Sequence, residues 1–196
     1  MTIEEACNDK GIDQAEVEIK LAGLESEPED TAHNFIEWDP GFLCDYIMNT
    51  HHRFVLKSLP ELVQYTEKIA RVHGDNHPEL KEVSGLFAEI NRELLQHLKN
   101  EEENLFPAIK EFLKSGSVKA KATIKTQIAR LSAEHDFAGG AMDKINIITK
   151  GYAVPADGCN TYQVTFRLLE QFEDDLHVHV HLENNILFPK ALKSVN

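Results

Sequence analysis

The sequence is poor in cysteine and in basic residues, and each shortage excludes a class of protein. Its three cysteines, Cys7, Cys44 and Cys159, are odd in number and far apart, so we expect neither a disulfide framework nor a zinc–thiolate site, and a reducing, cytoplasmic location is predicted. Twenty Lys and Arg against 33 Asp and Glu leave a formal net charge of −13, which excludes nucleic-acid backbones and anionic membrane surfaces as partners. No apolar run approaches the ~18 residues of a membrane span, and no signal peptide is expected.

The chain divides into a small appendage and one larger domain. Its 196 residues are enough for one globular domain, because a domain takes roughly 100–200 residues. Residues 1–32 combine weak helical periodicity with the polar, Pro-containing linker SEPED, and they predict a short N-terminal helical appendage. Residues 33–196 form the main domain. It carries all ten histidines, a number that calls for an explanation.

The main domain is predicted to form four long amphipathic helices. Apolar residues recur at spacings of three and four, and alternating β-branched residues are scarce. Asp39 followed by Pro40 is typical of a helix start. The expected helices cover about 40–72, 78–113, 117–149 and 159–190, with bends at Pro60 and Pro107 and an end near Pro189. Short connections between four helices predict an all-α, up-down-up-down four-helix bundle.

An internal repeat carries histidines. HLKNEEENLFP at 97–107 and HVHLENNILFP at 179–189 share the pattern His-x3-Glu-x3-Leu-Phe-Pro. Upstream of each copy stands a His-x-Phe motif, beginning at His52 in the first and at His135 in the second. Helices one and two therefore resemble helices three and four. Each helical hairpin contributes one histidine from its first helix and a His-x3-Glu pair from its second.

The repeat predicts a metal site. Residues four apart lie on one helix face, and these histidines share the apolar, inward-facing stripes of their helices. Buried carboxylates among histidines are costly unless a cation joins them. Mixed nitrogen and oxygen donors without thiolate favour two first-row ions bridged by both glutamates, a non-haem di-iron centre with an oxo or hydroxo bridge. The six predicted ligands are His52, His97, Glu101, His135, His179 and Glu183.

Other histidines and acids have plainer interpretations. Periodicity alone leaves His51 and His52 both open, and only the His-x-Phe repeat favours His52. His177 and His181 fall on a polar helix face and are expected in solvent, as are the loop histidines His33, His73 and His77 and the acids Glu102 and Glu103. His177-x-His179-x3-Glu183 also matches a cupin metal motif, but that fold requires many short strands, which a helical sequence does not offer.

The motifs resemble a known family. HLKNEEENLFP, SAEHDFAGG and DDLHVHVHLENNILFP, with THHRFVLKSLPEL upstream, are similar to the hemerythrin-like domain of the Repair of Iron Centres (RIC) di-iron proteins over about residues 33–194. The resemblance implies the same six ligands. It also implies a cytoplasmic stress protein whose clients are iron–sulfur proteins damaged by nitrosative or oxidative stress, repaired by supply of iron. Residues 2–24 resemble only the second half of the family's N-terminal domain and lack its Cys-Cys pair.

The resemblance leaves more than one activity open. Reduction of NO at the di-iron centre and reversible O2 or NO sensing use the same ligands, so whether the protein is an enzyme is open, as is a homodimer. Leu131 and Gly139 stand one turn from His135, where an oxygen-carrying hemerythrin has a further histidine, which disfavours O2 storage. Glu93 and Glu134 are the carboxylates expected nearest the ligands, where they would hydrogen-bond a ligand or accept an outgoing iron.

Overall fold

The computed structural model describes Cys7, Asp13, Ala15, Val17 and residues 34–195. The chain folds as two compact units, Met1–Asn34 and Phe35–Asn196. The appendage predicted over residues 1–32 lies almost wholly outside the described residues, as does His33. The larger unit is helical, with no strand among the residues that the structure describes.

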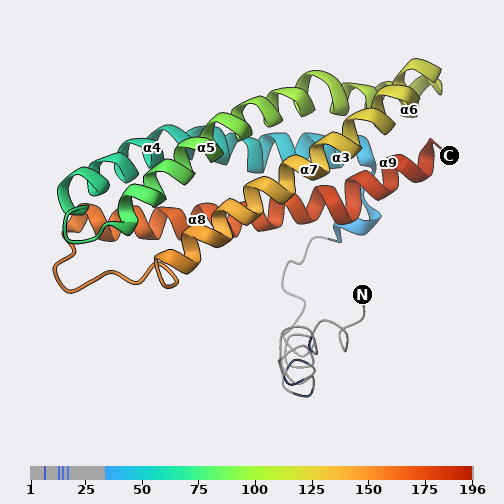
Figure 1. The fold of residues 1–196 in the computed structure, drawn as a ribbon. Helices are drawn as coiled ribbons and strands as arrows, with labels where there is room; N and C mark the ends of the chain where they lie inside the picture. The colour runs from blue at the N-terminus through green and yellow to red at the C-terminus, as the bar shows by residue number, and fades with distance from the viewer. Residues whose placement is uncertain (1–6, 8–12, 14, 16, 18–33, 196) are drawn as a thin grey trace. The chain divides into compact units, whose positions relative to one another are not determined.

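The second unit contains the four long helices that the sequence predicts, although three of them are interrupted (Figure 1). A short 3-10 turn, η1 (Phe35–Glu37), precedes them. The first consists of α3 (Pro40–Ile47), η2 (Met48–His52) and α4 (Arg53–His73), and the second of α5 (Glu79–Asn100), η3 (Glu101–Leu105) and α6 (Phe106–Ser115). The third is α7 (Val118–Ile148), and the fourth consists of α8 (Asn160–Leu182), η4 (Glu183–Leu187) and α9 (Phe188–Ser194). The expected all-α four-helix bundle is confirmed.

Local sequence signals set the helix starts. The Asp39 carboxylate accepts hydrogen bonds from the backbone N–H groups of Gly41 and Phe42, and Pro40 occupies the first helical position. Ser117 caps α7 by accepting from the Ala120 N–H. Gly116, with φ of 65°, ends α6 in the left-handed conformation that an amino acid with a Cβ rarely adopts.

The irregularities of the helices differ from those expected. Pro60, where the sequence predicts a bend, lies inside the continuous helix α4. The interruptions are instead π-helical segments, η2, η3 and η4, of five residues each. Pro107 and Pro189 each occupy the second position of the helix that follows η3 or η4. The fourth helix therefore continues through α9 to Ser194, beyond the predicted end near Pro189, because a proline is tolerated in a first helical turn.

Two apolar clusters make up the core, and polar residues separate them along the bundle. One is built on α4, α5, α7 and α8 and includes Phe87, Phe166 and Phe172. The other joins α3, α6, the first half of α7 and α9, and includes Phe106 and Phe188. On each long helix the buried histidines, with Glu101 and Glu183, lie where one cluster gives way to the other.

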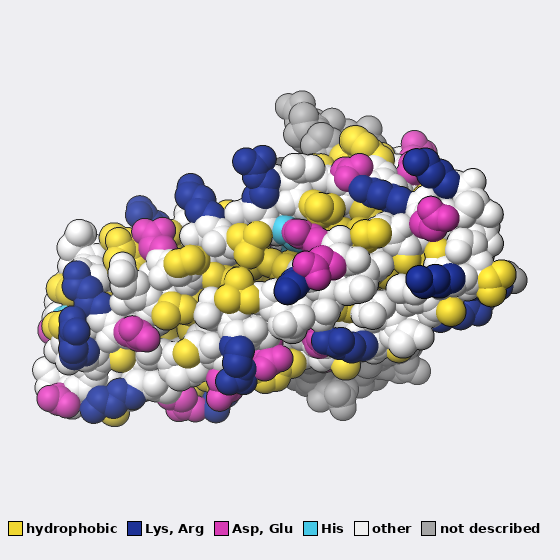
Figure 2. Space-filling view, turned by 90° about the horizontal axis from the view of Figure 1, so that it is seen from above, with side chains coloured by type: hydrophobic (Ala, Val, Ile, Leu, Met, Phe, Trp, Pro, Cys, Tyr) yellow, Lys and Arg dark blue, Asp and Glu magenta, His cyan; other side chains and the backbone are white. Residues whose placement is uncertain are grey.

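The outer face in Figure 2 is of mixed charge. Acidic and basic side chains are interspersed there with apolar ones, and a little histidine surface is visible near the middle beside acidic side chains. Among the helices of the described part of the chain, none is long and apolar enough to cross a membrane.

Candidate metal centre

The π-helical segments bring the predicted ligands into the bundle. His52 ends η2, Glu101 begins η3 and Glu183 begins η4. A π-helical turn holds an extra residue relative to an α-helical turn, and such turns occur frequently at functional sites. The same irregularity falls on the equivalent glutamate in both copies of the repeat, so the two hairpins share this local geometry as well as their sequence motif.

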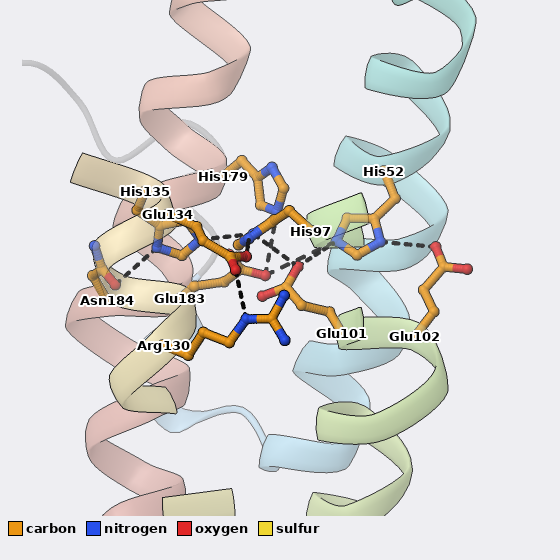
Figure 3. Close-up of polar contacts among 10 residues, drawn as sticks. All are labelled: His52, His97, Glu101, Glu102, Arg130, Glu134, His135, His179, Glu183 and Asn184. Atoms are coloured by element: carbon orange, nitrogen blue, oxygen red, sulfur yellow. Dashed lines mark hydrogen bonds and ion pairs between the residues drawn. The ribbon is translucent and has the colours of Figure 1, made fainter. Parts of the chain in front are cut away.

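All six predicted ligands meet in the interior, at most 3% exposed to solvent. They form two groups, in which one donor atom of each residue lies within 4.8 Å of the others. One group contains His52 and His179, the other His97 and His135, and both contain Glu101 and Glu183. Figure 3 shows these side chains converging from all four long helices. Each carboxylate is therefore shared between the groups, as the bridging arrangement requires.

Distances within each group are short. In the first, His52 Nε2 lies 3.4 Å from Glu101 Oε2, and His179 Nε2 lies 3.2 Å from Glu183 Oε1. The second group has the corresponding pairs His97 Nε2–Glu101 Oε2 at 3.3 Å and His135 Nε2–Glu183 Oε2 at 3.1 Å. In all four histidines it is Nε2 that faces the carboxylates (Figure 3).

The donor set fits divalent metal ions. Both oxygens of Glu101 and of Glu183, and Nε2 of His52 and His179, are buried without a hydrogen-bond partner among the described residues. Unpartnered buried polar atoms cost about 1–3 kcal/mol each, and more when they are charged, so this arrangement is unfavourable unless a ligand satisfies it. Imidazole nitrogens with carboxylate oxygens are donors that first-row transition metals accept.

Charge pairing dominates the titration of the residues in this site. Burial lowers the pKa of His52, but the close contacts and negative charges of Glu101 and Glu183 outweigh it and raise the pKa to about 10. Burial also lowers the pKa of His97, and Glu101 reverses that effect and raises it to about 9. The histidines in turn hold the pKa of Glu183 below its usual value despite complete burial. Metal binding must therefore displace protons from imidazole.

The outer ring nitrogens of three histidines are hydrogen-bonded, which fixes the direction of their inner nitrogens. The Nδ1 atom lies 2.8 Å from Glu102 Oε1 for His52, 2.9 Å from Glu134 Oε2 for His97, and 3.0 Å from Asn184 Oδ1 for His135. Each Nδ1–H donates to the oxygen, so Nε2 is left as the electron-pair donor. His179 differs, because its Nδ1 has no hydrogen-bond partner in the described part of the chain.

Of the two carboxylates expected beside the ligands, the structure brings only one to them. Glu134 contacts His97 across the bundle rather than its chain neighbour His135, and Arg130 Nε donates to its other oxygen at 2.7 Å. Glu93 does not reach the centre, and its carboxylate accepts from Arg92 on the surface.

Sequence reasoning missed Glu102 and Asn184. Glu102 was expected in solvent, whereas its carboxylate bonds to His52. Both residues directly follow a shared glutamate, and each bonds to the first-helix histidine of its own hairpin. The repeat held this signal, because Glu102 and Asn184 occupy equivalent positions in the two copies.

The remaining histidines lie outside the centre. His51 is buried, but its Nδ1 lies 2.9 Å from Asp175 and its ring stacks on that of His179 with centroids 5.6 Å apart, so His52 is the residue that joins the cluster. His177 and His181 are exposed, as predicted. His73 and His77 are half-buried and contact Cys159 and Asp157, respectively, in the segment that leads into α8.

Fold and site together define a four-helix-bundle protein with a buried His/Glu cation site. Residues 45–191 match the hemerythrin HHE cation binding domain. The chain is also 33% identical to the iron-sulfur cluster repair protein YtfE of Yersinia pseudotuberculosis serotype O:1b (strain IP 31758), and 32% identical to YtfE of Yersinia pestis (strain Pestoides F). Each similarity covers 98% of this chain and 83% of the relative. The chain therefore belongs to the hemerythrin HHE family and, within it, to the Repair of Iron Centres family.

Proposed function

We propose that the protein holds two non-haem iron ions, with an oxo or hydroxo bridge, and repairs iron–sulfur clusters damaged by nitrosative or oxidative stress by donating iron. The single observation that carries this proposal is the sharing of two fully buried carboxylates between two His-rich groups. The relatives named above are iron–sulfur cluster repair proteins, which supports the same function here. The clients would be damaged iron–sulfur proteins of the cytoplasm.

In this proposal each iron has two imidazoles and both carboxylates as ligands. His52 and His179 would serve one ion, His97 and His135 the other, and Glu101 and Glu183 both. Iron in such a site supplies a redox-active cation that binds NO or O2 and that can be passed to another protein. The chain's own task is to present deprotonated Nε2 atoms, which the hydrogen bonds at Nδ1 orient before metal arrives.

The donor count supports release of iron. Two imidazoles and two shared carboxylates offer fewer donor atoms than a six-coordinate ion takes, so solvent or a small ligand would complete the coordination of a bound iron. His179 is the least restrained ligand, because no described residue bonds to its Nδ1. An ion held partly by an imidazole that lacks this outer hydrogen bond is easier to remove than one whose ligands all have it.

Isotope transfer tests the proposal. The protein is loaded with 57Fe and incubated anaerobically with an NO-damaged iron–sulfur protein, without added iron. We expect the cluster absorbance of the client to recover and 57Fe to appear in its Mössbauer spectrum. A Glu101→Gln/Glu183→Gln variant should give neither, whereas the exposed change Glu103→Gln should give both. Iron donation would be contradicted if the double variant restored the cluster absorbance as well as the wild type does. It would also be contradicted if the client recovered its cluster without containing 57Fe. Formation of N2O from NO by the protein alone would instead favour NO reduction.

A further inference from the structure

A second cluster of metal-ligating side chains lies away from the buried centre. Asp143 on α7 and Glu173 and His177 on α8 each offer one donor atom, and these atoms lie within 4.8 Å of one another. Helices α7 and α8 are neighbours in the bundle (Figure 1). Glu173 and His177 are four residues apart, so they project from the same helix face, as His97 and Glu101 do. None of the three residues belongs to the buried centre.

The burial of these residues is uneven. Glu173 is only 7% exposed, although a glutamate is rarely buried unless it is paired. Asp143 and His177 are exposed and border it from solvent. The cluster is therefore anchored by one inner carboxylate and open on its outer side, unlike the centre, whose ligands are all enclosed.

Its negative charge has little compensation. The Asn146 amide donates to Glu173 Oε2 at 2.8 Å, and this neutral group does not balance the charge. Among the ion pairs of the described residues, no lysine or arginine pairs with Asp143 or Glu173, and the neighbouring Lys144 pairs with Glu82 instead. Two carboxylates this close repel each other, and a divalent cation between them removes the repulsion.

Tyr152 provides an independent sign that a polar ligand belongs here. It is only 6% exposed, and its hydroxyl has no hydrogen-bond partner among the residues described. Burial first, and then the negative charge of the nearby Glu173, raise the pKa of this hydroxyl. A buried hydroxyl without a partner costs about 1–3 kcal/mol, and a water bound to a cation at Glu173 would supply the missing partner.

We propose that Asp143, Glu173 and His177 form a second site, for an exchangeable divalent first-row cation such as Fe2+. Two carboxylates and one imidazole suit such an ion, and water completes its coordination. With two of three ligands exposed, the ion exchanges more readily than one in the buried centre. This inference rests on the proposed function: the second site would hold ferrous iron that is entering or leaving the bundle.

Titration with Co2+ tests the site in the protein as purified, with its own metal in place. Equilibrium dialysis and the visible spectrum of bound Co2+ should show one ion bound in addition to those in the bundle. In the Asp143→Asn/His177→Ala variant we expect at least tenfold weaker binding of that ion. The matched control is Asp174→Asn/His181→Ala, which removes the same kinds of group from exposed positions on α8, and it should bind Co2+ as the wild type does. Glu173→Gln, which keeps the hydrogen bond from Asn146, should weaken binding as Asp143→Asn/His177→Ala does.

Each other result overturns the site. The site is refuted if the wild-type protein binds no additional Co2+, or if the Asp143→Asn/His177→Ala variant binds Co2+ as tightly as the wild type does. It is also refuted if the matched control loses as much Co2+ binding as that variant, because such a loss would indicate binding to the acidic surface in general. Iron is measured in the same samples. If the bundle contains no iron but Co2+ still binds at Asp143 and His177, the proposed function is contradicted and the second site is supported. Failure of the proposed function can therefore be distinguished from failure of the second site.

Discussion

The Nε2 atoms of His97 and His135 lie 3.0 Å apart, although the residues are 38 positions apart in the chain and belong to different helices. Their Nδ1 atoms are held by Glu134 and Asn184, so both rings are directed from outside toward one point. With Nδ1–H of each ring donating outward, both Nε2 atoms are left as electron-pair donors, and in the proposed centre they would bind one ion while the outer hydrogen bonds stay as they are.

The shared glutamates should matter more for metal content than any single histidine. We expect wild-type protein to hold about two irons per chain, as two four-residue groups in a bundle core imply. Glu101→Ala or Glu183→Ala should reduce this to well below one, because each carboxylate serves both ions. His52→Ala should retain more iron than either. Metal analysis by mass spectrometry measures the iron content of each variant, and Glu103→Ala, at an exposed position, is the control. If Glu101→Ala loses no more iron than His52→Ala, the bridging role of Glu101 is contradicted.

The hydrogen bond outside His97 should strengthen metal binding. Glu134→Ala leaves the His97 ring free to turn, and loss of such a contact reduces metal affinity by about 10- to 100-fold. Glu93→Ala is the matched control, because Glu93 lies on the neighbouring surface but pairs with Arg92. Competition against a chelator of known affinity measures both variants. Equal affinities would show that the bond between Glu134 and His97 does not support the metal.

Cys159 should react as a thiolate near neutral pH. The hydrogen bond from His73 and then the backbone N–H of Tyr162 lower the pKa of this exposed thiol to about 7. The thiolate is the nucleophile, so the alkylation rate should rise with pH and reach half its maximum near pH 7. His73→Ala should shift the midpoint upward by about one pH unit or more. Iodoacetamide labelling followed by mass spectrometry assigns the rate to Cys159, and a midpoint that His73→Ala leaves unchanged would refute the pairing.

Two glycines should respond to alanine in opposite directions. A Cβ at Gly140, inside α7, would meet no atom within 4 Å, so Gly140→Ala should raise the free energy of unfolding by about 1 kcal/mol through helix propensity. Gly116 also has open space, but its φ is 65°, and Gly116→Ala should lower stability by about 1 kcal/mol or more. Denaturant unfolding of the metal-loaded variants measures both effects, and a gain at Gly116 would contradict the backbone argument.

The sequence predicted the helices and the meeting of the six ligands, because both follow from periodicity and from a repeat. The π-helical segments could not be predicted in the same way, because η3 begins at Glu101, whose carboxylate lies beside His52 of another helix, and that contact is not local in sequence. For the same reason Glu93, one turn before His97, was a reasonable but misplaced candidate. The π-helical turn at Glu101 and the packing of helices against one another decide which carboxylates reach a histidine. Neither feature can be recognised from neighbouring residues in the sequence.

Each four-residue group takes two members from the first hairpin and two from the second, so neither hairpin contains a complete site. Iron bound there would link the halves of the repeat, and a ligand that binds only the folded state stabilises that state by mass action. The melting temperature of the protein should therefore rise with iron occupancy. Under the proposed function, a chain that has donated its iron is also the less stable chain. Donation would then shorten the lifetime of the donor unless iron is restored.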